Sequence, residues 1–424
     1  MPVARRIPYD LGGFIHSGGS IGRLMTLDRI PVLPGDTHAI SLAGGIRLSP
    51  LRRNLVLDAR VDLFAFYVPH RHVYANWVDF CLKGYDENET LASVTIPDGG
   101  RPALGTVAEG PVPRHVLVPY NQVWNRYFRH PSFEADVVPD DQMLGSAADG
   151  RFGRPCGHLP TLWSTPVDDQ SDASADRRVP LDGGQLDVTK LEIQKAEYRG
   201  EVRRDYQTNR YTDWLRTTYG TGVNIDADRR PLLLMRESAW LSGYDVDGTS
   251  ADALGNYGGK SSGIIGMRIP PRVFPERGTI LIMCLVRFPP ILEKGIHPEE
   301  SRVNPTYLQE AGDPELIGAQ PPRDLLLNEV QEGASATSVG KVPFGQEWRT
   351  GHNRVHPMFG DVLGHPFIRP TLSAYNARYI VDTFYNSIFR TTQLQHWQVY
   401  LRKNNPAKRF IPGVFSSIYS GAKK

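Results

Sequence analysis

Cysteine is scarce in this sequence, and its placement argues against two kinds of structural site. The 424 residues contain three cysteines, Cys81, Cys156 and Cys284, which lie far apart and form no Cys-x-x-Cys pair. An odd, widely spaced set does not favour a disulfide framework or a zinc site, and it is typical of a protein that assembles in a reducing compartment. We therefore expect reduced cysteines and no bound metal.

Long apolar runs are also lacking. The longest apolar stretch, residues 280–286, is much too short for a membrane-spanning helix and suits a buried strand instead. The first ten residues, MPVARRIPYD, carry two arginines with no apolar segment behind them. This pattern does not predict a secretory signal peptide.

Neither sign of charge dominates, because 48 Lys and Arg stand against 46 Asp and Glu, a formal net charge of +2. The chain is therefore no polycation, and any contact with nucleic acid has to come from local basic patches. Glycine (41 residues) and proline (34 residues) exceed average usage, which favours many turns and long connections over a helix bundle. At 40%, the hydrophobic residues are sufficient for a substantial core.

Residues 55–68 show the clearest strand pattern in the chain. Apolar residues recur at every second position from Leu55 to Leu63 and so share one face. The opposite face begins with Asp58, Arg60 and Asp62 and continues with Phe64, Phe66 and Val68. We expect a strand that starts with one wet face, becomes buried on both faces and ends at Pro69, as in an all-β sandwich.

Other segments predict further strands and one helix. Residues 231–235, 279–288 and 398–401 are strand candidates bounded by Pro, Gly or Asp clusters. Residues 188–219 have apolar residues near four-residue spacing and predict a helix that ends at Gly220. The stretches 168–187 and 331–342 predict long loops, which favour subunit contacts over a compact enzyme core.

Candidate metal and phosphate motifs are weak. His70 and His72 could form half of a metal site on an extended strand, but no third ligand cluster is identifiable, so we expect structural histidines. Asp226, Asp228, Asp245 and Asp247 are possible calcium ligands, but the spacing of an EF-hand loop fails and an Asx-rich turn is favoured. Residues 258–261 (GGKS) lack the first glycine of a phosphate-binding loop and predict a glycine-rich surface turn. No catalytic nucleophile is marked by its local sequence, so we expect no enzyme and no cofactor.

Several segments, in order along the chain, resemble the major capsid protein of the Microviridae, the small icosahedral phages with circular single-stranded DNA. The segments that carry the resemblance are RLSPLRRNLVLDARVDLFAFYVPHRHVY (residues 47–74), IGRLMTLDRIPVLPGD (21–36), DADRRPLLLMRESAWLSGYDVDGT (226–249), FPERGTILIMCLVRFPP (274–290) and AGDPELIGAQPPRDL (311–325). Weaker similarity is found in PYNQVWNRYF (119–128), LPTLWSTP (159–166) and QLQHWQVY (393–400). Residues 131–187 and the basic tail after Tyr400 depart from the family pattern.

The resemblance implies a single domain, residues 1–424, with an all-β fold. This fold is an eight-stranded antiparallel jelly roll (β-sandwich) with a few helices and long insertion loops at about residues 75–220 and 290–390, followed by a basic C-terminal tail, residues 401–424. It implies pentamers and a T=1 icosahedral shell of about sixty copies, enclosing single-stranded DNA in the virion and assembled in the host bacterial cytoplasm. The implied partners are a small basic DNA-binding protein, a pilot protein, and in some relatives spike and scaffolding proteins.

The basic residues after Tyr400 are the main candidates for genome contact. Arg402, Lys403, Lys408 and Arg409 have no acidic residue among them, and Phe410, Phe415 and Tyr419 are interleaved with cations at the tail. Cations neutralise phosphates and aromatic faces stack unpaired bases. Arg52 and Arg53, in the basic turn that begins at Arg47, are weaker candidates. The alternative is that the tail docks on a neighbouring subunit through its aromatic residues.

A different class of protein also fits parts of the sequence. In a jelly-roll carbohydrate-binding protein or glycoside hydrolase, Trp163, Trp240 and Trp397 would stack sugars and Asp/Glu pairs would carry out acid–base chemistry. The same tryptophans are equally suited to anchor a core. An oligomer of capsid size would separate the two possibilities.

Overall fold

The structure is a computed structural model of the chain. It describes residues 6–51, 58–74, 77, 93–95, 104–105, 111–129, 154–156, 192, 231–246, 258–288, 323–326, 338–342, 375–376, 379–380, 388–389 and 395–410. The predicted helix at residues 188–219 lies outside this part of the chain apart from Glu192. Cys81, Arg52 and Arg53 also lie outside it.

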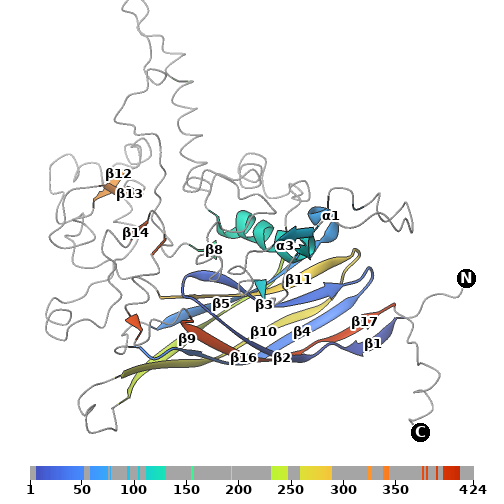
Figure 1. Ribbon diagram of the computed structural model, residues 1–424, viewed down its shortest axis with the longest axis horizontal. Helices are drawn as coiled ribbons and strands as arrows, with labels where there is room; N and C mark the ends of the chain where they lie inside the picture. Colours follow the sequence, from blue (N-terminus) through green and yellow to red (C-terminus); the bar gives the residue numbers. More distant parts are fainter. Residues whose placement is uncertain are drawn as a thin grey trace, which may run out of the picture.

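Eight longer strands form two four-stranded antiparallel layers (Figure 1). The first layer, which we call the open sheet, has the order β2-β16-β4-β10, and the second, the covered sheet, has the order β3-β11-β5-β9. The open sheet consists of β2 (Gly13–Gly19), β16 (Trp397–Asn404), β4 (Thr37–Leu48) and β10 (Gly258–Val273). The covered sheet consists of β3 (Arg23–Val32), β11 (Gly278–Arg287), β5 (Ala59–Pro69) and β9 (Leu232–Val246).

The chain passes between the two layers in the order of a jelly roll. β2, β3, β4 and β5 alternate between the open and covered sheets, and β9, β10, β11 and β16 alternate back. At one edge the layers are joined, because β9 pairs with β10 from Val246 opposite Gly258 to Ser242 opposite Ser262. The predicted all-β jelly roll is therefore confirmed.

Shorter elements extend this framework. β1 (Ile7–Asp10) pairs with β17 (Pro406–Arg409), which continues onto β4, and β8 (Arg154–Pro155) pairs with β3. Three small hairpins are β6 (Ser93–Thr95) with β7 (Pro111–Pro113), β12 (Arg323–Leu326) with β13 (Ser338–Val342), and β14 (Tyr375–Asn376) with β15 (Tyr379–Ile380).

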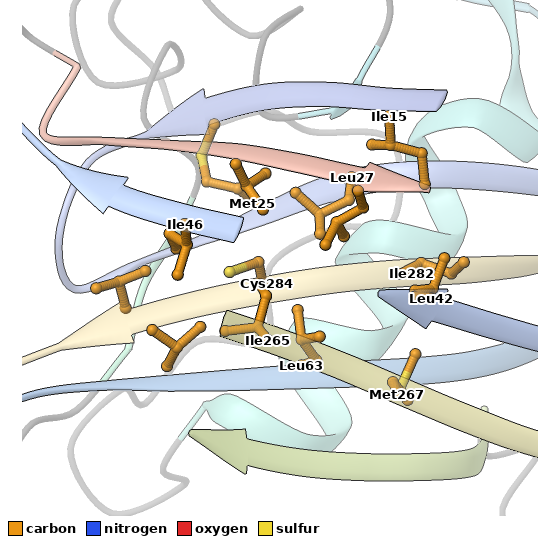
Figure 2. Close-up of a cluster of buried hydrophobic side chains, with 14 of the residues drawn as sticks. Ile15, Met25, Leu27, Leu42, Ile46, Leu63, Ile265, Met267, Ile282 and Cys284 are labelled. Carbon is orange, nitrogen blue, oxygen red and sulfur yellow. The ribbon is translucent and has the colours of Figure 1, made fainter. Parts of the chain in front are cut away.

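The main core lies between the two sheets (Figure 2). Ile46 and Leu42 of β4 and Ile265 of β10 face Leu63 of β5 and Cys284 of β11 across it. Every second residue of these strands contributes to the core, because alternate side chains of a strand point to opposite faces. Cys284 and Cys156 are buried free thiols.

A second core lies on the outer face of the covered sheet, beneath the helices α1 (His70–Val73), α3 (Arg114–Val123) and the π-helical turn η3 (Trp124–Phe128) (Figure 1). Phe64 and Phe66 of β5 pack here against Tyr127 and Phe128. Tyr120 anchors α3 by donating its hydroxyl to the Leu24 carbonyl at 2.9 Å. The predicted burial of β5 on both faces is thereby confirmed.

Three local expectations were wrong. Asp62, expected on a wet face, is fully buried because Arg60, Arg236, Arg287 and Ser238 surround its carboxylate. Residues 258–261 form the start of strand β10 and pair with β9, so they are not a surface turn. Residues 338–342, expected to belong to a long loop at 331–342, form strand β13 and pair with β12. By contrast, β5 does end at Pro69, as expected, and the chain then turns into α1.

Candidate nucleic-acid interface

The outward face of the open sheet carries basic and aromatic side chains in cross-strand rows. One row runs from Arg47 of β4 to Gln398 of β16, and the next from Gly45 through Tyr400 to His16 of β2. The third row runs from Ala43 through Arg402 to Phe14. On β10, Ile264 lies opposite Gly45 and Arg268 opposite Ser41, so both extend this face.

The four strands of the open sheet contain no acidic residue. Their Lys and Arg residues are Arg47, Lys260, Arg268, Arg272, Arg402 and Lys403, although Asp and Glu make up 46 of the 424 residues of the chain. A surface of this kind attracts anions, since none of its guanidinium groups is neutralised by a carboxylate of the same sheet.

Arg47 and Tyr400 hold each other in place at the centre of the face. Arg47 donates to Gln398 Oε1 from Nε at 3.1 Å and from Nη2 at 2.7 Å, and it donates to the Tyr400 hydroxyl at 3.2 Å. Its guanidinium carbon lies 5.5 Å from the centre of the Tyr400 ring, and His16 packs edge-on against the same ring at 5.2 Å. The tyrosine is therefore a pre-positioned aromatic surface beside a cation.

Beside Tyr400, glycine leaves the sheet flat. A Cβ atom at Gly45 would meet nothing closer than the Gly263 carbonyl oxygen at 3.9 Å, so the space above Gly45 is open. Phe14 and Ile264, on either side, are 77% and 86% exposed. A planar group can therefore approach the sheet over Gly45, while Arg47 and His16 contact the Tyr400 ring from the two neighbouring strands.

The structure separates the four predicted tail cations into two pairs. Residues 401–409, which we expected to begin a basic tail, form the end of β16 and the whole of β17. Arg402 and Lys408 are exposed. Lys403 instead pairs with Asp28 at 2.5 Å, and Arg409 pairs with Asp36 at 2.9 Å and donates to the Pro31 carbonyl at 2.7 Å.

Of the three aromatic residues expected to contribute to the tail, the structure describes Phe410. Phe410 packs beneath Arg6, whose guanidinium carbon lies 4.9 Å from the ring centre, and a Cβ at Gly35 would meet the same ring. This contact is made within one chain. Phe415 and Tyr419, with Arg52 and Arg53, lie outside the described residues.

The described residues do not place His70 and His72 in a metal site. His70 and His72 lie in the helical turn α1, where residues two apart point in different directions. Burial, with the nearby charges of His115 and Arg277, lowers the pKa of His70 to about 4. Among the described residues, no group of three His, Cys, Asp or Glu side chains could hold a metal ion. Of the possible calcium ligands only Asp245 is described, within β9.

The comparison with known families decides the identity of the chain. Residues 2–200 and 182–418 match the family model described as Capsid protein (F protein). The chain belongs to this family. The similarity extends to individual members, and the predicted resemblance to the Microviridae capsid protein is confirmed.

Three related F proteins cover almost the whole chain. Capsid protein F of Escherichia phage G4 is 34% identical over 422 residues, and that of Enterobacteria phage phiK is 34% identical over 428 residues. Capsid protein F of Escherichia phage alpha3 is 32% identical over 428 residues, and each alignment covers 98% of both chains.

Membership in the F family makes the chain a major capsid protein, a structural component of the virion that associates with further copies of itself, and not an enzyme. Trp397, a candidate sugar platform, is fully buried and donates its indole N–H to the Ser20 carbonyl, so it is a core anchor. Trp163 lies outside the described residues. No helix in the described part of the chain is long and apolar enough to cross a membrane.

Sequence reasoning identified Arg402 and Arg47 but missed Arg268, Tyr400, Phe14 and His16. A usable signal was present, because the segments of β2, β4, β10 and β16 are each free of Asp and Glu. Only the strand register shows that these separate segments form one surface.

Proposed function

We propose that copies of this chain assemble through pentamers into a closed T=1 shell of about sixty copies, which encloses a circular single-stranded DNA genome. The near-complete match to the F family supports this proposal. The jelly roll supplies a rigid tile, and connections between its strands supply contacts with neighbours. Assembly takes place in the host bacterial cytoplasm.

In this proposal the outward face of the open sheet contacts the genome. The observation that supports the assignment is the absence of Asp and Glu from its four strands. Arg47, Arg268 and Arg402 are positioned to neutralise phosphates, while Tyr400 and Phe14 offer faces on which unpaired bases stack. Stacking on an aromatic side chain contributes about 1–3 kcal/mol per base and is tolerant of sequence. Such a surface suits a genome whose sequence differs under each copy of the shell.

The whole chain carries only +2, so it cannot by itself neutralise an enclosed genome. We infer that a small basic DNA-binding protein supplies most of the neutralising charge, in keeping with the partners implied for this family. A pilot protein, and in some relatives spike and scaffolding proteins, complete the proposed set of partners.

The genome contact is tested with a variant in which Arg47, Arg268 and Arg402 are replaced by Gln. The salt dependence of binding to oligothymidylate should fall by about 0.7 in log–log slope for each lost phosphate contact, or about 2 for all three. Tyr400→Ala should weaken binding by a further ~1–3 kcal/mol with little change of slope. Fluorescence anisotropy across a salt titration measures both quantities.

The matched control replaces three exposed arginines outside the open sheet, Arg71, Arg126 and Arg277, by Gln. It removes the same charge from the chain and should leave the slope near the wild-type value. If both triple variants lower the slope equally, the interaction depends on total charge and the open sheet is not the contact surface.

A further inference from the structure

Basic and aromatic side chains gather where the helices α1 and α3 meet one end of the covered sheet (Figure 1). We call this group the His70–His115 cluster. Its members are Arg29 of β3, His70 and Tyr74 at the two ends of α1, Arg114 and His115 at the start of α3, and Arg277 and Thr279 around the start of β11. Arg29 lies on the same face as the helices, because it is opposite Leu281 of β11, which belongs to the core beneath them.

Stacking and hydrogen bonds fix the two histidines. Their rings stack with 5.1 Å between centres, and His70 Nε2 lies 3.4 Å from the Thr279 hydroxyl. The Tyr74 hydroxyl accepts the backbone N–H of His115 at 3.3 Å and lies 3.0 Å from His115 Nδ1. The arrangement in which this hydroxyl both accepts and donates places the ring hydrogen of His115 on Nε2.

The three arginines of the cluster lack partners of their own. In the part of the chain that the structure describes, the guanidinium groups of Arg29, Arg114 and Arg277 form no hydrogen bond or ion pair. Arg114 Nε and His70 Nδ1 are buried without a hydrogen-bond partner, and His70 is only 6% exposed. Burial raises the pKa of Tyr74, and the nearby charges of Arg114 and Arg277 oppose that rise. Buried donors without acceptors are costly, so this arrangement calls for an acceptor.

The carboxylates beside these arginines in the sequence already have partners. Asp28 pairs with Lys403 at 2.5 Å, and Glu276 pairs with Arg71 at 2.9 Å. Asp28 also attracts Arg29, whose pKa is lowered by burial. The three arginines of the cluster, with Lys403 and Arg71, are five cations against two carboxylates, which leaves an excess of three positive charges.

The same excess acts on the histidines. Burial lowers the pKa of His70, and the charges of His115 and Arg277 lower it further. Burial likewise lowers the pKa of His115, in which Arg29 and Arg277 act in the same direction. Positive potential therefore reaches the centre of the cluster from β3 and from the turn before β11.

The amino end of α3 adds backbone donors to the cluster. This helix has ten residues and begins at Arg114, and its first turn has neither a capping side chain nor an acidic residue. The first N–H groups of a helix have no acceptor within the helix, and together with the helix dipole they attract anions. The cluster thus combines charge and hydrogen-bond donors from separate elements.

The excess charge and the number of donors indicate the kind of anion. Chloride carries a single charge and no directional acceptor, and a carboxylate carries a single charge on two oxygens that lie in one plane. Phosphate presents tetrahedrally arranged oxygens and more than one negative charge near neutral pH. It can therefore accept from guanidinium groups that approach from different elements.

We propose that the His70–His115 cluster is an oxyanion site that binds inorganic phosphate. Arg29, Arg114 and Arg277 neutralise the ion, and the Nε2–H of His115 and the first N–H groups of α3 donate to it. The bound ion ties the helices to the covered sheet. Because the site lies on the other side of the sandwich from the outward face of the open sheet, it depends neither on the genome contact nor on self-assembly.

The first test titrates inorganic phosphate into the full-length protein by isothermal titration calorimetry, in chloride buffer at constant ionic strength. The wild type should bind one phosphate per chain, and Arg114→Gln/Arg277→Gln should bind it about tenfold more weakly or worse. The matched control Arg272→Gln/Lys408→Gln removes two exposed cations of β10 and β17 and should bind like the wild type. No binding by the wild type, or equal affinities of the two double variants, would refute the site.

Competition identifies the source of the phosphate group. Oligothymidylate without a terminal phosphate should not displace inorganic phosphate from the wild type. Displacement would show that the cluster takes the phosphodiesters of DNA, and it would overturn the assignment to a free ion.

Thermal unfolding shows whether the arginines act through the anion. In chloride buffer, Arg114→Gln/Arg277→Gln should be at least as stable as the wild type, since it relieves repulsion among cations. Phosphate at constant ionic strength should then raise the melting temperature of the wild type and of the control variant only. Lower stability of Arg114→Gln/Arg277→Gln already in chloride would show that these arginines are engaged within the protein, and it would contradict the proposal.

Sulfate tests the part of the histidines, because it remains a dianion throughout the range in which histidine titrates. An anion in the cluster favours the protonated imidazoles, so sulfate should bind the wild type more tightly as the pH falls from about 8 to about 6. This dependence should be weaker in His115→Gln and unchanged in His16→Gln, which alters an exposed histidine of the open sheet. Sulfate affinity that does not change with pH would show that the histidines do not face the anion.

Discussion

Alternate side chains of β5 belong to the two different cores of the protein. Leu63 and Ala65 belong to the main core between the sheets, whereas Phe64 and Phe66 point toward α3 and η3. Phe64 meets Phe128 edge-on at 5.2 Å between ring centres. At these positions a polar group would lose water and the aromatic packing, even at Phe64, where the guanidinium carbon of Arg236 lies 5.4 Å from the ring centre.

Phe64→Asp should therefore prevent folding, since it removes a buried aromatic ring, a loss of about 3–5 kcal/mol, and adds the cost of burying a carboxylate. Phe14→Asp is the matched control, because Phe14 is 77% exposed on the open sheet. Soluble yield and thermal unfolding monitored by near-ultraviolet circular dichroism measure the effect. A folded Phe64→Asp protein would show that the outer face of β5 is accessible to water.

Buried histidines make stability depend on pH. Burial, together with His115 and Arg277, lowers the pKa of His70 to about 4 from an ordinary value of 6.5, and burial also lowers the pKa of His115 and His38. A histidine whose pKa is lowered by folding does not reduce the free energy of unfolding above pH 6.5, because it is neutral in both the folded and the unfolded state. Below pH 6.5 the unfolded state binds the proton first, so stability falls until about pH 4.

We expect the free energy of unfolding to decrease between pH 6.5 and pH 4, with His70 contributing up to about 3 kcal/mol. In His70→Gln this decrease should be smaller, whereas His16→Gln, at an exposed position, should behave like the wild type. Urea unfolding at a series of pH values gives the comparison. A His70→Gln curve parallel to that of the wild type would contradict the assignment.

At the scale of elements, the close pairing of β4 with β16 determines the shape of the open sheet. Gly44 and Gly45 are neighbours in β4, but they face different environments. A Cβ at Gly44 would lie 1.9 Å from the Tyr400 carbonyl oxygen, whereas one at Gly45 would meet no atom within 3.8 Å. The first glycine is required for β16 to approach, and the second leaves the outward face flat.

Gly44→Ala should consequently lower the melting temperature, with a loss of about 1–3 kcal/mol from overpacking, while Gly45→Ala should have little effect on stability. Because Gly45→Ala places a methyl group beside Tyr400, it should weaken oligothymidylate binding instead. Calorimetry and anisotropy on the same two variants test both halves of this prediction. Equal melting temperatures would show that β16 can shift away from β4 without cost.

The elements differ in how well the sequence alone predicts them. β5 and β11 were predicted from alternation and from an apolar run, because burial determines their residues directly. β10 was interpreted as a turn at its start, since Gly258 and Gly259 have no side chain to show a period. α3 was missed because Pro119 and a run of apolar residues resemble a strand. Its helical form depends on packing over β11 and on the hydrogen bond from Tyr120 to the Leu24 carbonyl.

The candidate site was only partly predictable for a similar reason. The cations after Tyr400 are visible in the sequence, but their pairing with Asp28 and Asp36 requires contacts across more than 370 residues. Replacing Lys403 or Arg409 would therefore disturb the fold as well as any contact with DNA. Arg47, Arg268 and Arg402 come from three distant segments, and only the strand register places them on one face.

At the scale of the whole molecule, the formal net charge is only +2, whereas the four strands of the open sheet carry six Lys and Arg and no acidic residue. Under the proposed function, this arrangement lets one nearly neutral protein bind nucleic acid on the open sheet while its other surfaces contact neighbouring copies. In the proposed shell we expect many modest contacts, repeated by symmetry, in place of any single strong interface.

We expect the purified protein to sediment as pentamers or larger closed assemblies. Since charged contacts contribute, raising the salt concentration should shift the distribution toward smaller species. Analytical ultracentrifugation over a range of protein and salt concentrations measures this. A stable monomer at high concentration and low salt, with and without scaffolding partners, would contradict self-assembly.

The position of β16 between β2 and β4 has a consequence for protein synthesis. β16 comes after β2, β4 and β10 in the sequence. In the sheet, however, it lies between β2 and β4, which the ribosome makes first. A nascent chain therefore lacks Tyr400 and Arg402, and its β2 and β4 cannot be joined into a finished layer. The proposed genome-contacting face therefore forms only after β16 has been made, so we expect a nascent chain that lacks β16 not to bind DNA through this face.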